Sequence, residues 1–124
     1  MDESMIAEAV GGAPAFELLV EAFYQGVESD PPLRALYPAD LGPGKRHLAL
    51  FLLQRFGGPS TYDSLRGHPR LRMRHMPFAI DTAMRDAWVR HMQNAIRVTP
   101  AFAPHESHLM PYFEEAATFL VNTD

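Results

Sequence analysis

Residues 66–78 read Arg-Gly-His-Pro-Arg-Leu-Arg-Met-Arg-His-Met-Pro-Phe. Pro69 suits the first turn of a helix, where the N–H group that proline lacks is not needed. Pro77 cannot continue a helix, because its ring clashes with the preceding turn. The stretch therefore predicts a helix of about two turns, bounded by the two prolines.

A histidine lies in the middle of the apolar stripe on this short helix. Leu71, His75 and Phe78 follow one another at i, i+4 and i+7, which places them on one face, while the neighbouring arginines point elsewhere. Neutral imidazole is the commonest metal ligand, so His75 is a candidate ligand for a metal or a metal cofactor. The alternative is a core histidine whose ring nitrogens bond to backbone carbonyls.

The composition fits one globular unit without thiol chemistry. A chain of 124 residues with 47% hydrophobic residues is expected to form a single domain over residues 1–124. The absence of cysteine excludes disulfides, zinc–thiolate sites and iron–sulfur clusters. No apolar run reaches the length of a membrane span, and the acidic start Met-Asp-Glu-Ser lacks the basic region of a secretory signal. We therefore expect a cytoplasmic protein with no membrane partner.

Positive charge is concentrated in the middle of the chain. All eleven Lys and Arg lie between Arg34 and Arg97, where four aspartates oppose them and leave a net charge of +7. The flanks on both sides contain Asp and Glu but no Lys or Arg. This distribution favours a local anion site over a nucleic-acid surface, which usually needs a basic domain, and no nucleic-acid partner is expected. The alternative is that these cations pair with the acidic flanks, with little effect on stability.

The apolar periodicity along the rest of the chain is helical, and no alternating run of strand length occurs. Helices are predicted over residues 1–10, 14–29, 33–37, 45–56 and 81–99. A last helix either begins near Met110 or begins near Pro104 and bends at Pro111. Residues 60–67 read as an irregular polar loop, the kind of segment that often carries binding groups. The predicted fold class is all-α.

Other familiar chemistries lack their sequence signatures. Gly57-Gly58-Pro59 matches neither a phosphate-binding loop nor a dinucleotide fingerprint, and there is no nucleophile elbow. A metal hydrolase would have to use His68 with His75, or His105 with His108, and the first pair has no carboxylate at ligand spacing. A helical interaction module without any cofactor remains an alternative.

Short motifs spread along most of the chain together match one known pattern. They are Ala9-Val-Gly-Gly, Phe23-Tyr24, Leu36-Tyr37-Pro38, Gly57-Gly58-Pro59 with Thr61-Tyr62, Arg66 to His75, Asp86-Ala-Trp88 and Leu120-Val-Asn122. The long central motif, followed by Trp88 thirteen residues after His75, is the most specific of them. In this pattern the chain resembles the truncated haemoglobins of group II, a bacterial branch of the globins in which four main helices pack two over two around haem.

The resemblance implies a role for each candidate residue. His75 would be the proximal ligand of the iron of haem b, iron protoporphyrin IX. The ligand-binding side of the iron would be lined by Tyr24, Tyr37, Trp88, Gly44 and Leu48. The other pocket and propionate contacts would come from His47, Phe51, Tyr62, His68, Leu71, Arg72 and Phe78. Among these, Arg72 is the expected main cation for the propionates, and no catalytic residue is assigned.

Three positions matter as departures from the family pattern. Gly44 stands at the distal gate and is expected to leave the route to the iron open, although glycine near a helix start can also be a plain structural choice. His47 stands where arginine is common, so it is expected to bind a propionate less firmly. Pro111 interrupts the last helix.

Trp88 is expected to bury an indole N–H without a partner, which bound O₂ would supply.

The resemblance also implies a function. We expect reversible binding of O₂, CO and NO at a histidine-ligated iron, with oxygen transport, NO detoxification or peroxidase-like chemistry as candidate roles and a reductase as a candidate partner. The alternative is a non-catalytic domain for haem-based sensing or interaction. The expected state of assembly is a monomer or a homodimer.

Overall fold

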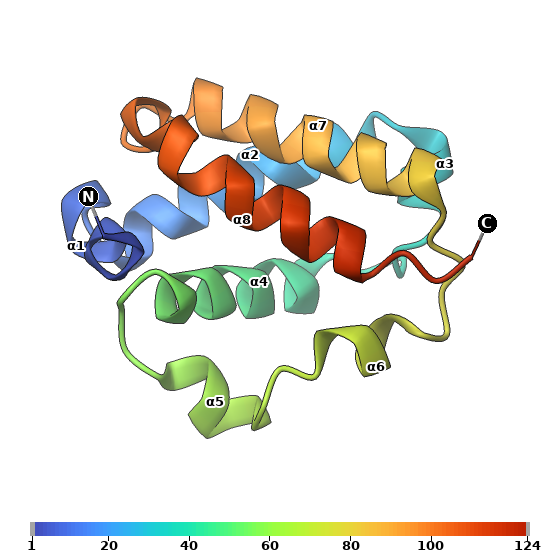
Figure 1. The fold of residues 1–124 in the computed structure, drawn as a ribbon, viewed down its shortest axis with the longest axis horizontal. Coiled ribbons are helices and arrows are strands. Elements are labelled where there is room, and N and C mark those ends of the chain that lie inside the picture. Colours follow the sequence, from blue (N-terminus) through green and yellow to red (C-terminus); the bar gives the residue numbers. More distant parts are fainter. Residues whose placement is uncertain (1, 124) are drawn as a thin grey trace.

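The computed structural model describes residues 2–123, and over that range every regular element is a helix (Figure 1). The long helices are α2 (Ala13–Glu28), α4 (Gly42–Arg55), α7 (Thr82–Val98) and α8 (Glu106–Phe119). The short ones are η1 (Glu3–Met5), α1 (Ile6–Val10), α3 (Pro31–Arg34), α5 (Thr61–Arg66), α6 (Leu71–His75) and η2 (Ala103–His105). Met1, part of the first predicted helix, lies outside the described residues, as does Asp124.

Two pairs of long helices form the sandwich. Helix α2 packs against α4, α7 packs against α8, and α2 also contacts α7, which joins the pairs. In Figure 1, α5 and α6 lie below α4, on the side away from α7 and α8. The predicted all-α class and the 2-over-2 arrangement are confirmed.

Helix α2 shows how local sequence fixes the long elements. Gly11 and Gly12 adopt positive φ angles of 102° and 75°, which ends α1 and turns the chain into α2, where proline occupies the first turn. At the other end, Ser29 closes α2 before Pro31 starts α3. The apolar face predicted from the periodicity is the buried one, including Phe16, Leu19 and Phe23.

Several boundaries differ from the predictions. Helix α4 begins three residues early, at Gly42, because Pro43 can occupy its first turn. Helix α3 begins at Pro31 rather than Leu33 for the same reason. Asp81 caps α7 as predicted, its side chain accepting a hydrogen bond from the Met84 N–H at 2.8 Å. Helix α8 runs through Pro111, so the longer of the two predicted alternatives is the correct one.

The prediction of an irregular loop over residues 60–67 is wrong. These residues form α5, which is anchored to the rest of the protein by the buried ring of Tyr62 and ends at Gly67, where φ is +74°. The Asp63 N–H also donates to the side chain of Gln54 on α4 at 3.0 Å. A single anchoring ring leaves no apolar period in so short a segment, so the helix could not be recognised from the sequence.

Helix α6 is shorter than predicted. It starts at Leu71 rather than at Pro69, because Arg70 adopts a left-handed conformation with φ of 46°. Its apolar face is only partly shielded: Leu71 and His75 are half-buried, and Phe78 is 42% exposed.

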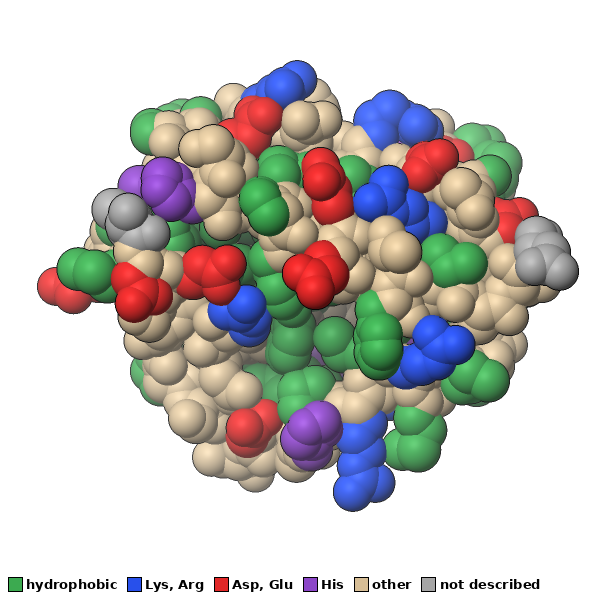
Figure 2. Space-filling model, viewed as in Figure 1, with side chains coloured by type: hydrophobic (Ala, Val, Ile, Leu, Met, Phe, Trp, Pro, Cys, Tyr) green, Lys and Arg blue, Asp and Glu red, His purple; other side chains and the backbone are tan. Residues whose placement is uncertain are grey.

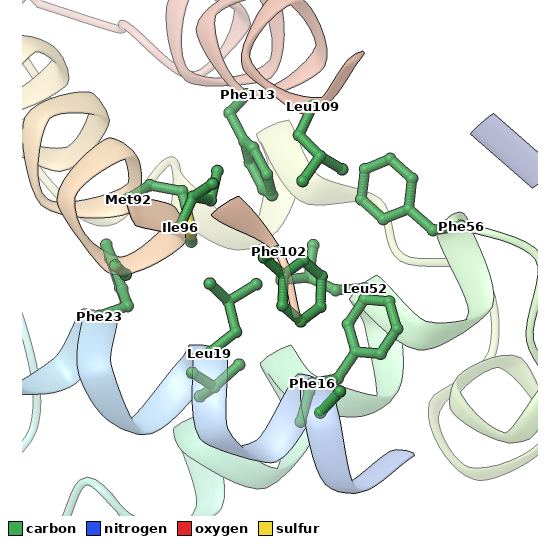
Figure 3. Close-up of a cluster of buried hydrophobic side chains, with 14 of the residues drawn as sticks. Phe16, Leu19, Phe23, Leu52, Phe56, Met92, Ile96, Phe102, Leu109 and Phe113 are labelled. Atoms are coloured by element: carbon green, nitrogen blue, oxygen red, sulfur yellow. The ribbon is translucent and has the colours of Figure 1, made fainter. Parts of the chain in front are cut away.

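The core lies toward one end of the long helices and the site toward the other, and Leu52 and Phe113 belong to both. Figure 3 shows Phe16, Leu19, Leu52, Phe56 and Phe102 converging with side chains of α7 and α8. The rings of Phe16 and Phe102 meet edge to face, with centroids 5.0 Å apart. This cluster fixes the sandwich at one end and leaves the other end of each helix to line a cavity.

Candidate functional site

A cavity of about 480 Å³ opens between the sandwich and the α5–α6 segment. Its walls are mostly apolar and come from α2, α4, α7, α8 and the segment from Tyr62 to Ile80. On the face seen in Figure 2, hydrophobic side chains floor a hollow in the middle of the molecule. A cavity of this volume lies in the range of cofactor and ligand pockets.

The cavity brings together eleven of the thirteen site residues expected from the sequence. These are Tyr24, Tyr37, Gly44, His47, Leu48, Phe51, Tyr62, Leu71, His75, Phe78 and Trp88. They are spread from residue 24 to residue 88, so only the fold brings them together.

His68 and Arg72 do not line the cavity. The His68 Nδ1 accepts a hydrogen bond from the N–H of Arg70, two residues later in the chain, at 3.1 Å. The Arg72 guanidinium donates to the backbone carbonyl of Phe119 and lies over the Phe119 ring, with its Cζ 5.5 Å from the centroid. The expectation that Arg72 is the main cation at the cavity is therefore not supported, because this side chain is engaged at the end of α8.

The His75 ring has one nitrogen engaged and one available. The Nδ1 atom lies 2.6 Å from the Leu71 carbonyl oxygen one turn earlier, and since a carbonyl can only accept, Nδ1 carries the proton. The Nε2 atom of the neutral ring then carries a lone pair. The two alternatives from the sequence are thus combined, because the backbone satisfies one ring nitrogen and the other remains able to bind a metal.

Three polar aromatic side chains line the same cavity. The rings of Tyr24 and Tyr37 meet edge to face with centroids 5.6 Å apart, and the Trp88 ring packs on Phe23 at 5.1 Å. Burial raises the pKa of Tyr37, the neighbouring Tyr24 raises it further, and a hydrogen bond with the Trp88 side chain lowers it. The Tyr37 hydroxyl is thus close enough to the Trp88 side chain to be a candidate partner for the indole N–H in the absence of a ligand.

Gly44 makes room for the hydroxyl of Tyr24. A Cβ atom added at Gly44 would lie 2.8 Å from the Tyr24 Oη, closer than side-chain contacts allow. The expected open route past Gly44 is thus partly filled by this phenol. Burial also raises the pKa of Tyr24 to about 12, so the hydroxyl keeps its proton at neutral pH and is a hydrogen-bond donor.

Two arginines that were not among the expected site residues, Arg66 and Arg85, line the cavity, and Arg85 is engaged with Asp86 and Thr118. The Nη1 of Arg66 donates to the Nδ1 of His47 at 2.6 Å. Burial lowers the pKa of His47, and the positive charges of Arg66, Arg46 and Arg74 lower it further, so the neutral ring is favoured as acceptor. Nothing in the sequence distinguishes Arg66 from the other arginines of the central stretch; only the approach of α5 to α4 does.

The arginines of the central stretch carry charge without an acidic partner. Elsewhere cations do pair with the flanks, as in Arg55 with Glu3 at 2.8 Å and Arg97 with Glu106 at 2.7 Å. In residues 2–123, no carboxylate pairs with the arginines at positions 66, 70, 72 and 74. The prediction of pairing across the fold is right for part of the basic middle, and the α5–α6 edge of the cavity keeps a free positive charge.

The chain belongs to the bacterial-like globin family, whose model matches residues 5–122. Within that family it is similar to the truncated haemoglobins. The group 2 truncated haemoglobin YjbI of Bacillus subtilis (strain 168) is 42% identical over 89 residues, which cover 72% of this chain and 67% of that protein.

Solved structures give the same result. A haemoglobin from the thermophilic phototrophic bacterium Chloroflexus aurantiacus is 51% identical and superposes with a TM-score of 0.90 over 94% of this chain and 97% of that one. The group II truncated haemoglobin from Bacillus anthracis is 36% identical, with a TM-score of 0.90 over 95% and 96%. The resemblance seen in the sequence is confirmed.

Haem b is the cofactor of this family, and the donor set of the cavity fits it. The group is a largely apolar disc with an iron at its centre and two carboxylates at one edge. The cavity offers apolar walls, one imidazole with a free Nε2, and a cationic edge at Arg66. Each chemical part of haem therefore has a counterpart among the residues that line the cavity.

None of the helices in the described part of the chain combines the length and the apolar character needed to cross a bilayer.

Proposed function

We propose that this protein binds O₂ reversibly, together with CO and NO, at a haem held by His75. The observation that carries the proposal is the composition of one cavity, which joins an imidazole with a free Nε2 to three proton-carrying aromatic side chains. Haem supplies an iron that binds diatomic ligands when it is ferrous.

The chain would hold the cofactor through three kinds of contact. His75 supplies the nitrogen ligand, and its Nδ1 bond to Leu71 fixes the tautomer that can act as one. Leu48 and Phe51 on one side and Phe78 on the other supply apolar surface. Arg66, assisted by His47, supplies hydrogen-bond donors for a carboxylate at the cavity edge.

The polar aromatic residues would govern how long a ligand stays. An O₂ molecule held at such an iron would carry partial negative charge on its outer atom, and CO would carry less. The hydroxyls of Tyr24 and Tyr37 and the indole N–H of Trp88 are donors that can stabilise such charge. We therefore propose that the protein releases O₂ slowly.

Turnover is a further part of this proposal. NO detoxification or peroxidase-like chemistry would need electrons from a reductase, whereas a sensing domain would bind the same ligands without consuming them. Following NO or peroxide consumption by the purified protein with a chemical reductant separates the two.

The basic test is spectroscopic. Protein expressed with haem available should show a Soret band, and the ferrous form should change spectrum on addition of O₂ or CO and return when the gas is removed. A protein that stays colourless and does not bind added haemin would contradict the proposal.

A further inference from the structure

Helix α6, which carries His75, is not held in place by burial of its own residues. None of its five residues is buried. Met73 is 59% exposed, and Met76, directly after the helix, is 57% exposed. A helix of this length is far below what is stable alone, so other bonds must define where it lies.

The side chain of Asn122, near the other end of the chain, supplies such bonds. Its Oδ1 accepts from the Ile80 N–H at 3.0 Å. Its Nδ2 donates to the carbonyl of His75 at 3.2 Å and to that of Phe78 at 2.9 Å. Both the oxygen and the nitrogen of the Asn122 amide thus form hydrogen bonds with the segment from His75 to Ile80.

The backbone around Asn122 reinforces this contact. The N–H groups of Asn122 and Thr123 both donate to the Ile80 carbonyl, at 2.9 and 3.3 Å. In Figure 1 the tail after α8 runs beside the connection from α6 to α7. Arg72 adds a second link between the two regions through its bond to the Phe119 carbonyl.

We infer that Asn122 is a positioning residue for the His75 imidazole. Carbonyls in the last turn of a helix lack intrahelical partners, and Asn122 fills that need at His75 itself. The His75 carbonyl also accepts from the Phe78 N–H at 3.0 Å, so the turn after the histidine is bonded from two sides. Fixing this backbone fixes the angle from which the ring faces the cavity.

This inference rests on the proposed function, because the purpose of the position is ligation of iron by His75. It goes beyond it by assigning a role to a residue that does not line the cavity. Asn122→Ala removes all three side-chain bonds. Asn122→Asp keeps the acceptor for Ile80 and sets carboxylate oxygen against the two carbonyls, so it should be at least as harmful.

Asn94 offers a matched control. It is an exposed asparagine on α7, and in the described structure its side chain makes no hydrogen bond. Asn94→Ala should therefore behave as wild type. Both Asn122 variants should keep wild-type helical content, because Asn122 lies outside the helices.

The experiment compares the iron–histidine stretching band of the ferrous proteins by resonance Raman, and the rate of haem loss from the ferric proteins. In Asn122→Ala the band should shift or broaden, and haem loss should be faster by about tenfold, the effect of one ordinary hydrogen bond. Hydrogen exchange of the Ile80 amide should also be faster in purified Asn122→Ala than in the wild-type protein.

The outcomes separate the two proposals. If wild type shows no iron–histidine band, the proposed function fails, whatever the exchange data show. If wild type shows the band, and Asn122→Ala retains both the same band and the same rate of haem loss, the inference is overturned even if the variant is less stable.

Discussion

Gly44 and Tyr24 share one small volume at the wall of the cavity, and their energetic coupling can be measured. Gly44→Ala places a Cβ 2.8 Å from the Tyr24 Oη, so the buried phenol must move, at a cost of about 1–3 kcal/mol. The next atom of Tyr24, Cζ, lies 3.7 Å from the same point, an ordinary contact. In a Tyr24→Phe background, the same Gly44→Ala change should therefore cost little.

A double-mutant cycle followed by urea unfolding gives the coupling energy, and it removes the separate effect of alanine on the helix. We expect a coupling of about 1 kcal/mol or more. Additive effects of the two substitutions would show that Gly44 is only a helix-start residue, the alternative open from the sequence.

Trp88 tests the role of the polar aromatic group. Losing a donor worth about 1.4 kcal/mol changes a rate about tenfold, so Trp88→Phe should speed O₂ dissociation by at least that factor. The effect on CO should be smaller, because CO is less polar. Tyr24→Phe and Tyr37→Phe should have smaller effects than Trp88→Phe.

Stopped-flow dissociation of both gases from the same variant decides between hydrogen bonding and packing. Equal acceleration of O₂ and CO would assign Trp88 to packing against Phe23 and Phe113. Unchanged O₂ dissociation would remove the indole from the ligand site.

At the level of elements, an ionic contact ties the start of α3 to α7. The Oδ2 of Asp30 lies 2.8 Å from the His91 Nε2 and 3.6 Å from an Arg90 nitrogen. The hydrogen bond from His91, ahead of the charges of His91 and Arg90, lowers the pKa of Asp30 below its ordinary 3.8. Gly26 leaves the space for this contact, since a Cβ there would lie 2.6 Å from the His91 Nδ1.

The sign of the resulting pH dependence follows from the lowered pKa. The folded protein binds the Asp30 proton less tightly than the unfolded chain does, so the stabilisation is complete above pH 3.8 and is lost as pH falls through the folded value. Asp30→Asn should therefore destabilise the protein at pH 6, and its difference from wild type should shrink in acid.

Urea midpoints at pH 6 and at about pH 3 test this dependence. Asp63→Asn is a suitable control, because the exposed Asp63 side chain makes no hydrogen bond or ion pair within residues 2–123. A difference between Asp30→Asn and wild type that does not depend on pH would contradict the role of the carboxylate charge.

The length of a helix decides whether it can be predicted from the sequence. The long helices α2 and α7 were predicted to within a residue or two, because their apolar period persists over several turns between clear breakers. Helices α5 and α6 are too short to show a period. The sequence therefore predicts a loop where α5 lies, and it predicts a start at Pro69 for α6, before the left-handed Arg70.

The candidate site, too, could be predicted only in part from the sequence. The residues that the motifs marked, including His75 and Trp88, do line one cavity, because their positions depend on the long helices and on the central motif. The sequence points to Arg72 as the cation at the cavity edge, whereas the structure places Arg66 there; both are arginines of one stretch, and only tertiary contacts distinguish them. The role of Asn122 depends on bonds between residues more than 40 positions apart, which no local pattern contains.

Across the whole molecule, stability and function are divided between the two ends of the helix sandwich. The aromatic core around Phe16, Phe56 and Phe102 packs the four long helices together at one end of the sandwich. The cavity end depends instead on α6 and the tail, which are joined by polar bonds. His75 lies at this cavity end, and in the proposed function its imidazole would bind the haem iron.

The ligation by His75 is tested most directly by comparing His75→Ala with His68→Ala, two histidines of the same stretch of which only the first lines the cavity. Absorption and resonance Raman spectra of the ferrous proteins are the measurement. We predict that His68→Ala keeps the wild-type Soret and iron–histidine bands, and that His75→Ala loses both. A five-coordinate histidine-type ferrous spectrum in His75→Ala would contradict the account.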